Sequence, residues 1–280
     1  MTGNPWWTRV AVRPSHASTR DVVSAAMFQA GAQGVHEAGD LLVTHLESSV
    51  DSTVIEYAVR AADPHATVET HAIPTVDWSV AWRELIRAHD VGRLTVAPPW
   101  LVEGMDPIRT VVIEPAMAFG TGDHPTTRGV LRLMQRVLVA GDSVADLGAG
   151  SAVLAIAAAK LGASSVAAVE CDRDAISNAE ENVTRNGVGD RVRVIEGDAA
   201  LLLPLLAPVR VVLANIVSSV LTGLLPVIER SLSADGVAIL GGILDEEREK
   251  MCALFAAGGW RVIHEDAEAE WWSVAIDRKR

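Results

Sequence analysis

The feature that most constrains the fold is a regular alternation of short apolar segments with amphipathic helical segments, which runs from residue 126 onward. Strands that alternate with helices are joined by right-handed crossovers and form a mostly parallel sheet. This pattern predicts strands at residues 143–147, 165–169, 192–195, 209–214, 237–240, 261–264 and 271–276, and helices at 126–139, 152–161, 173–185, 220–232 and 245–257. Because no helical segment separates the last two strands, one of them should run antiparallel to its neighbours.

The first part of the chain has the pattern of a small α+β unit. Residues 7–12 alternate between polar and apolar as a strand does, and residues 18–32 place apolar side chains at helical spacing after good N-cap residues. Two further strands are expected at residues 41–45 and 54–60. Together these segments predict a sheet with helices on one face.

A transition region links the two parts, with a helix expected at residues 77–89 and a strand at 109–114. Trp78 and Trp82 lie four residues apart on one face of that helix, where packing between domains is a better explanation than substrate contact. The chain should therefore divide into an N-terminal α+β domain, a linker region and an α/β domain, at residues 1–75, 76–100 and 101–280.

The composition excludes several functional classes. The formal net charge of -12 gives little attraction to nucleic acid, so a basic protein or peptide, or a small substrate, is a better partner. Cys171 and Cys252 stand in unrelated segments, which indicates neither a disulfide framework nor a zinc site, and no metal is expected. No apolar run reaches membrane-spanning length and the first residues lack a signal-peptide pattern, so we expect a cytoplasmic protein.

Open parallel sheets bind ligands beyond the carboxyl ends of their strands. The first predicted strand ends at Asp146 and leads into a loop with Gly148 and Gly150, which lack the Cβ that would obstruct a close ligand. The spacing is Gly-x-Gly-x-Ala, with Ala152 last, and it suits an adenosine cofactor without a pyrophosphate better than a dinucleotide. A plain turn from strand to helix is the alternative explanation of such a loop.

The next three predicted strands also end in polar residues: Glu170, Asp198 and Asn215. Glu170 follows Gly148 by 22 residues and can accept hydrogen bonds from both hydroxyls of a ribose. Asp198 is either a residue at the adenine edge or a turn residue. Asn215 can orient a cofactor or a substrate amine, or it caps a turn. The Pro-Pro-aromatic sequence that holds flat nitrogens does not follow it, which favours a flexible amine.

The most unusual stretch is residues 119–127, FGTGDHPTT, which precedes a helix. Its glycines are typical of a loop that covers a site. Thr126 or Thr127 is expected to cap the helix. His124 is either a base or metal ligand or, as we expect, a structural histidine, because no partner ligand stands at a suitable spacing.

Three motifs resemble the ribosomal protein L-11 methyltransferase family: AFGTGDHPTTR at 118–128, DLGAGSA at 146–152 and ANI at 214–216. Further matches are at 77–78, 81–82, 241–244 and 270–271. The resemblance implies a seven-stranded Rossmann-like methyltransferase domain that uses S-adenosyl-L-methionine, and a ferredoxin-like N-terminal domain for substrate recognition. It further implies methylation of lysine ε-amines, the N-terminal α-amine, or both, on ribosomal protein L-11.

By the motifs, the resemblance also implies which residues bind the cofactor: Phe119, Gly120, Thr127, Gly148, Gly150, Glu170 and Asn215. The family usually has Thr where Asp123 stands, Gly where Ala152 stands and Asp where Glu170 stands. Ala152 adds one methyl group near the methionine end of the cofactor, which we expect the site to tolerate.

Methyl transfer needs alignment more than proton chemistry, so we expect no obligatory general base and assign Asn215 the role of orienting the amine. Three alternatives stay open: a methyltransferase of another protein or of a small amine, a nicotinamide-dependent reductase, and a non-catalytic relative that binds the cofactor.

Overall fold

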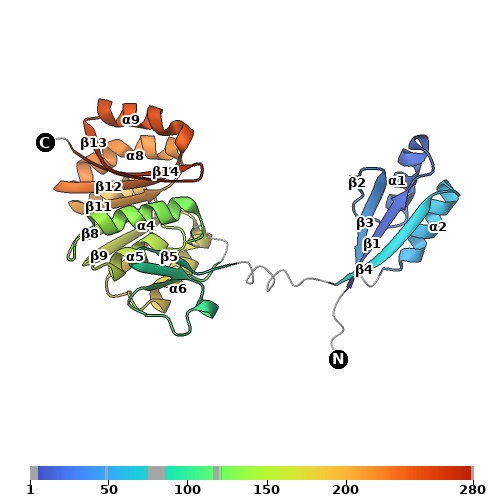
Figure 1. The fold of residues 1–280 in the computed structure, drawn as a ribbon, viewed down its shortest axis with the longest axis horizontal. Coiled ribbons are helices and arrows are strands. Elements are labelled where there is room, and N and C mark those ends of the chain that lie inside the picture. Colours follow the sequence, from blue (N-terminus) through green and yellow to red (C-terminus); the bar gives the residue numbers. More distant parts are fainter. Residues whose placement is uncertain (1–5, 48–49, 75–85, 116–119, 121, 279–280) are drawn as a thin grey trace. The chain divides into compact units, whose positions relative to one another are not determined.

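The computed structural model describes residues 6–47, 50–74, 86–115, 120 and 122–278 (Figure 1). The chain forms two compact units, Met1–Glu84 and Leu85–Arg280. The helix expected at residues 77–89, with Trp78 and Trp82, lies mostly outside the described residues. Its expected last residue, His89, instead begins a strand. No helix of the described part is long and apolar enough to cross a membrane.

The described part of the N-terminal unit is a four-stranded antiparallel sheet with two α-helices and one short 3-10 helix (Figure 1). The strand order is β2-β3-β1-β4. The strands are β1 (Trp6–Arg13), β2 (His36–Ala38), β3 (Leu41–Glu47) and β4 (Thr67–Pro74), and the helices are η1 (Ala17–Thr19), α1 (Arg20–Gln29) and α2 (Ser52–Ala62). A core shared by one sheet face and both main helices holds the unit together, including Val10, Met27, Leu42, Ile55 and Val59.

The strand expected at residues 54–60 is wrong, because this segment belongs to α2. Its β-branched residues favour a strand locally. The Asp51 carboxylate nevertheless accepts a hydrogen bond from Thr53 N at 2.9 Å and so caps the N-terminus of a helix. Ile55 and Val59 then lie on one helical face and are both fully buried. The burial of this face outweighs the local strand preference.

The C-terminal unit contains a seven-stranded sheet with the order β10-β9-β8-β11-β12-β14-β13. The strands are β8 (Ser143–Leu147), β9 (Ser165–Glu170), β10 (Val192–Glu196), β11 (Val209–Asn215), β12 (Leu232–Leu244), β13 (Trp260–Glu268) and β14 (Trp271–Arg278). β14 is antiparallel to both β12 and β13, which confirms the expected antiparallel strand. The predicted Rossmann-like fold is therefore correct.

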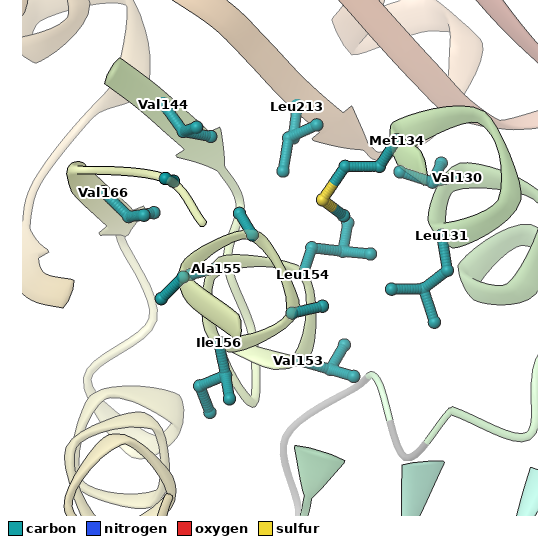
Figure 2. Packing of buried hydrophobic residues seen from close by; sticks show 14 of the residues in the cluster. Val130, Leu131, Met134, Val144, Val153, Leu154, Ala155, Ile156, Val166 and Leu213 are labelled. Atoms are coloured by element: carbon teal, nitrogen blue, oxygen red, sulfur yellow. The ribbon is translucent and has the colours of Figure 1, made fainter. Parts of the chain in front are cut away.

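Helices cover both faces of this sheet. They are α4 (Pro125–Val137), α5 (Val153–Lys160), α6 (Arg173–Arg185), α7 (Ala199–Leu206), α8 (Ser218–Ser231), η4 (Asp245–Glu247) and α9 (Arg248–Ala257). α4, α5 and α6 share one core with the sheet, and α7, α8 and α9 share the other. Figure 2 shows Met134 of α4, Leu154 of α5 and Leu213 of β11 gathered in the first of these cores.

A smaller three-stranded sheet packs beside α4 and α5. It consists of β5 (His89–Val91), β6 (Leu94–Ala97) and β7 (Thr110–Val112), with η3 (Pro99–Leu101) between the last two. β7 confirms the strand expected at 109–114, whereas β5 and β6 were not predicted. Both are short, at three and four residues, so they give little periodicity to detect.

Sequence reasoning also missed α7, a run of eight residues with the sequence AALLLPLL. Alanine and leucine favour a helix there, but the leucines recur without a polar face and Pro204 stands inside the helix, so the periodicity does not mark it. Asp198 caps the helix by accepting a hydrogen bond from Ala200 N at 2.7 Å. Only Leu203 is fully buried, while Leu201 and Leu205 are exposed.

Candidate active site

A cavity of about 630 Å³ lies at the carboxyl ends of β8, β9 and β11. It is where an open parallel sheet places its ligands. Six of the predicted site residues line the cavity: Gly120, Thr127, Gly148, Gly150, Glu170 and Asn215. They come from four separate segments of the chain, so the fold brings together residues that the sequence holds up to 95 positions apart.

The loop after β8 approaches its neighbours too closely for a side chain at Gly148. That residue has φ +68°, and a Cβ on it would lie 2.8 Å from Ile216 Cγ2. The amides of Gly148 and Ala149 both donate to Val169 O, at 2.9 and 3.1 Å, which fixes the loop against the end of β9. Left-handed backbone combined with close packing explains why glycine is needed here.

Glu170 joins the glycine loop to the end of its own strand. Its Oε2 accepts a hydrogen bond from Gly150 N at 2.8 Å, and its Oε1 accepts from Cys171 N at 2.8 Å and Asp172 N at 2.9 Å. The residue is buried, with 8% of its surface exposed, and it still lines the cavity. Three backbone donors fix the orientation of a carboxylate whose oxygens can accept further hydrogen bonds.

Asp146 supports the loop from behind the cavity. It is buried, and its Oδ2 accepts a hydrogen bond from Ala155 N in the first turn of α5 at 3.0 Å. Burial, with a smaller contribution from the Glu170 charge, raises the pKa of Asp146 to about 7. Its other oxygen, Oδ1, has no hydrogen-bond partner in the described structure. Asp146 is thus a positioning residue for the loop and for α5.

Asn215 and Thr127 meet at the end of β11. Asn215 Nδ2 lies 3.4 Å from Thr127 Oγ1, and Thr127 is fully buried. Asn215 Oδ1 is also buried and accepts no hydrogen bond from the described residues. On β12, a Cβ at Gly241 would lie 2.8 Å from this oxygen, so the glycine leaves room for it. A buried acceptor without a donor is unfavourable, and at the wall of a cavity it indicates that a ligand supplies the donor.

The segment before α4 departs from its predicted capping. His124, not Thr126 or Thr127, is the N-cap, and its Nδ1 lies 3.4 Å from Thr126 N and 2.8 Å from Thr126 Oγ1. Pro125 takes the first helical position, where its missing N–H costs nothing, so both threonines fall inside the first turn. The ring of His124 also contacts the edge of Trp271, with centroids 4.9 Å apart. These contacts are those of a structural histidine, and the residue also lines the cavity, so its structural role stays a prediction.

Ser151 ties the two loops of the site together, because its Oγ donates to Gly120 O at 2.6 Å. Phe119, which was expected beside the cofactor, lies outside the described residues. Asp198 caps α7 and is not among the residues that line the cavity, so its role at the adenine edge stays a prediction. Among the described residues, no group of three His, Cys, Asp or Glu side chains is arranged to hold a metal.

Two departures from the usual family residues have clear structural settings. Ala152 is fully buried at the N-cap of α5 with φ +64°, a left-handed conformation that a Cβ makes costly. Asp123 is exposed, and its Oδ1 lies 2.9 Å from His89 Nε2, while its carbonyl accepts a hydrogen bond from Arg128. Asp123 therefore connects the segment before α4 to β5.

Sequence reasoning did not identify the apolar side of the cavity, although two of its residues, Ile216 and Trp271, lie in motifs of the family resemblance. Ile216, Val217 and Val220 line it at the start of α8, and Trp271 lines it from β14. Trp271 belongs to a family match at 270–271, which was its only signal. The valines resemble any other apolar residue of a helix, and only the fold shows that Val217 and Val220 remain 60% and 50% exposed beside the cavity.

Comparison with known proteins gives one consistent result. The family model for ribosomal protein L11 methyltransferase (PrmA) matches residues 39–279. A ribosomal protein L11 methyltransferase of Chloroflexus aurantiacus is 38% identical over 253 residues, which are 81% of this chain and 76% of the relative. Its counterpart in Myxococcus xanthus is 34% identical over 259 residues, which are 91% and 87% of the two chains.

A solved structure supports the same similarity at the level of the fold. The ribosomal protein L11 methylase of Lactobacillus delbrueckii subsp. bulgaricus is 30% identical to this chain, with a TM-score of 0.62. The match covers 70% of this chain and 100% of the solved one.

Proposed function

Because this chain belongs to the ribosomal protein L11 methyltransferase family, we propose that it transfers methyl groups from S-adenosyl-L-methionine to amines of ribosomal protein L11. The target amines are lysine ε-amines, the N-terminal α-amine, or both. The observation that carries the proposal is the convergence of Gly148, Glu170 and Asn215 on one cavity at the carboxyl ends of the strands. A nicotinamide-dependent reductase, one of the initial alternatives, is inconsistent with the family.

The cavity fits the cofactor in size and in chemistry. Its volume of about 630 Å³ lies within the range of small-molecule sites. The loop from Gly148 to Gly150, whose only side chain is the methyl group of Ala149, provides a wall for the adenosine and methionine parts. Glu170 presents carboxylate lone pairs to the ribose hydroxyls. When bound, S-adenosyl-L-methionine supplies an electrophilic methyl group on a sulfonium centre.

The role of the protein is to bring a neutral amine to that methyl group in line with the carbon–sulfur bond. A lysine amine has an unperturbed pKa of about 10.4, so it must lose a proton before it can attack. The apolar side formed by Ile216, Val217 and Val220 removes water from the amine and thereby favours its neutral form. Asn215 Oδ1 then accepts a hydrogen bond from the amine and aligns its lone pair.

No side chain of the cavity has to act as a general base in this proposal. The imidazole of His124 is engaged as a helix cap, and Glu170 is held by three backbone amides. The proton that the amine gives up passes to solvent.

Loss of the Asn215 amide tests this assignment. We expect Asn215→Ala to lower kcat for methyl transfer by about 10-fold to 100-fold, which corresponds to one lost hydrogen bond to a polarised group. Cofactor affinity, measured by calorimetry with S-adenosylhomocysteine, should change far less than kcat. Leu205→Ala, on the exposed face of α7, is the matched control. Full transfer rate with full cofactor affinity in Asn215→Ala would show that the assignment is wrong.

The substrate is tested separately with a radiolabelled methyl donor. We expect ribosomal protein L11 to become labelled, both as a pure protein and within a whole lysate. Labelling of a different band alone would favour a methyltransferase of another protein or of a small amine. Cofactor binding with no transfer to any protein would favour a non-catalytic relative.

A further inference from the structure

A second cavity, of about 490 Å³, lies at the opposite ends of the strands of the seven-stranded sheet from the first cavity. It is built where β11, β12 and β13 begin and where β14 ends, and the last turn of α4 closes one side. Four arginines line it, Arg136, Arg210, Arg261 and Arg278, against two aspartates, Asp235 and Asp277. The lining therefore carries a positive charge within a chain whose formal net charge is -12.

Two of the arginines, Arg261 and Arg278, already have acidic partners and line the sides of the cavity. Arg261 pairs with Asp277 through two hydrogen bonds, of 3.0 and 2.6 Å. Arg278 Nη2 lies 2.9 Å from Glu229 Oε1, and its Nη1 donates to Gly258 O at 2.7 Å. These contacts already use the charge and much of the donor capacity of both guanidinium groups.

The other two arginines have unused capacity. Arg210 contacts Asp235 through Nε alone, at 3.1 Å, and its Nη1 is buried with no hydrogen-bond partner in the described structure. Arg136 is exposed on α4, and its side chain forms no ion pair or hydrogen bond with the described residues. A buried guanidinium N–H without an acceptor is unfavourable, and an anion in the cavity would supply that acceptor.

We propose that this cavity binds a small oxyanion of the phosphate class, with Arg136 and Arg210 as its ligands. The planar guanidinium matches the spacing of phosphate oxygens, and two of them on different elements can hold one group from two sides. The oxyanion comes either from free phosphate or from the phosphate of a mononucleotide. RNA is a poorer candidate, because the overall negative charge of the chain repels a polyanion.

A purely structural role makes a different prediction. Arg136 stands in the last turn of α4, where a cation stabilises the helix dipole without any ligand. Arg210 would likewise serve only to pair with Asp235. In that case the two arginines affect stability equally with and without phosphate.

The test is a titration of the full chain with sodium phosphate at constant ionic strength, followed by thermal unfolding and by ³¹P line broadening. We expect a saturable rise in Tm, and half-saturation at roughly tenfold higher phosphate in Arg136→Gln and in Arg210→Gln, the effect of losing one charge-assisted contact. Arg60→Gln is the control, because Arg60 is a half-exposed arginine of the N-terminal unit that pairs with Glu56 and does not line this cavity. Arg136→Gln keeps the test valid if Arg210→Gln fails to fold.

Titrations with uridine monophosphate and with a short RNA show whether the bound oxyanion is free phosphate, a mononucleotide or a nucleic acid. Uridine is chosen because an adenine nucleotide could also bind in the proposed cofactor cavity. Binding of uridine monophosphate tighter than phosphate identifies a nucleotide site, and equal binding identifies a site for the free ion. The proposal is overturned if the rise in Tm does not saturate, if both variants keep wild-type half-saturation, or if RNA binds much more tightly than either small anion.

Discussion

Asp146→Asn probes the most perturbed carboxyl group of the C-terminal unit. The carboxylate is buried beneath the glycine loop, and it bonds Ala155 N through one oxygen while the other oxygen has no partner among the described residues. Asparagine has nearly the same shape and can still accept the hydrogen bond from Ala155 N. The substitution therefore removes a titration while leaving the packing in place.

The size of the effect follows from linkage. The pKa of Asp146 rises from 3.8 to about 7, mainly because of burial. Between these two values the folded chain holds a proton that the unfolded chain has lost, so the free energy of unfolding falls as pH rises and levels off above pH 7. At about 1.4 kcal/mol per pH unit, the loss between pH 5 and pH 8 is on the order of 2–3 kcal/mol.

The assay is urea unfolding of wild type and variant at pH 5 and pH 8, without cofactor. We expect Asp146→Asn to gain about 2 kcal/mol relative to wild type on going from pH 5 to pH 8. Asp190→Asn, at an exposed aspartate paired with Arg191, should show no such gain. An identical pH dependence of wild type and Asp146→Asn would refute the conclusion that burial raises the pKa of Asp146.

Three further predictions follow from single contacts. In urea unfolding, Ala152→Gly should change the free energy of unfolding by less than about 1 kcal/mol. Glycine relieves the strain of the left-handed backbone, but the variant loses a buried methyl group and its unfolded chain is more flexible. Ala152→Val should lower the free energy of unfolding by more than about 2 kcal/mol. Glu170→Ala should weaken S-adenosylhomocysteine binding at least tenfold in calorimetry, since it removes both the ribose acceptor and the bond to Gly150 N, and unchanged affinity would contradict the assignment. Hydrogen bonds from Ser15 and Thr19 hold the pKa of Asp63 well below its usual range. The Tm of the wild type should therefore fall below about pH 4, as this carboxylate is protonated, and the Tm of Asp63→Asn should fall less over the same pH range.

Much of the C-terminal fold was predictable because the central strands β8, β9 and β11 are largely buried. Such strands are short apolar runs, and most of them are followed by a helix, as β9 is by α6, whose bounds at Arg173–Arg185 match the prediction. The failures at α2 and α7 have different causes. In α2, β-branched residues favour a strand locally, and burial of one helical face decides the outcome. In α7, alanine and leucine favour a helix, but the internal Pro204 and the absence of a polar face obscure it in the sequence.

The candidate site divides in the same way. Glycines and polar residues at strand ends carry a chemical signal, so Gly148, Glu170 and Asn215 could be named in advance. The bonds between them could not, because the three backbone donors to Glu170 and the missing donor to Asn215 Oδ1 depend on the folded geometry. The apolar side at Val217 and Val220 could not be predicted, because the sequence does not distinguish an exposed valine beside a cavity from a valine of the core.

The most direct test of the proposed function is mass spectrometry of ribosomal protein L11 after incubation with this protein and S-adenosyl-L-methionine. The account predicts a gain in mass by whole methyl groups, located on lysine side chains or on the N-terminal amine, and a strongly reduced gain with Asn215→Ala. Unmodified ribosomal protein L11 together with intact cofactor binding would contradict it.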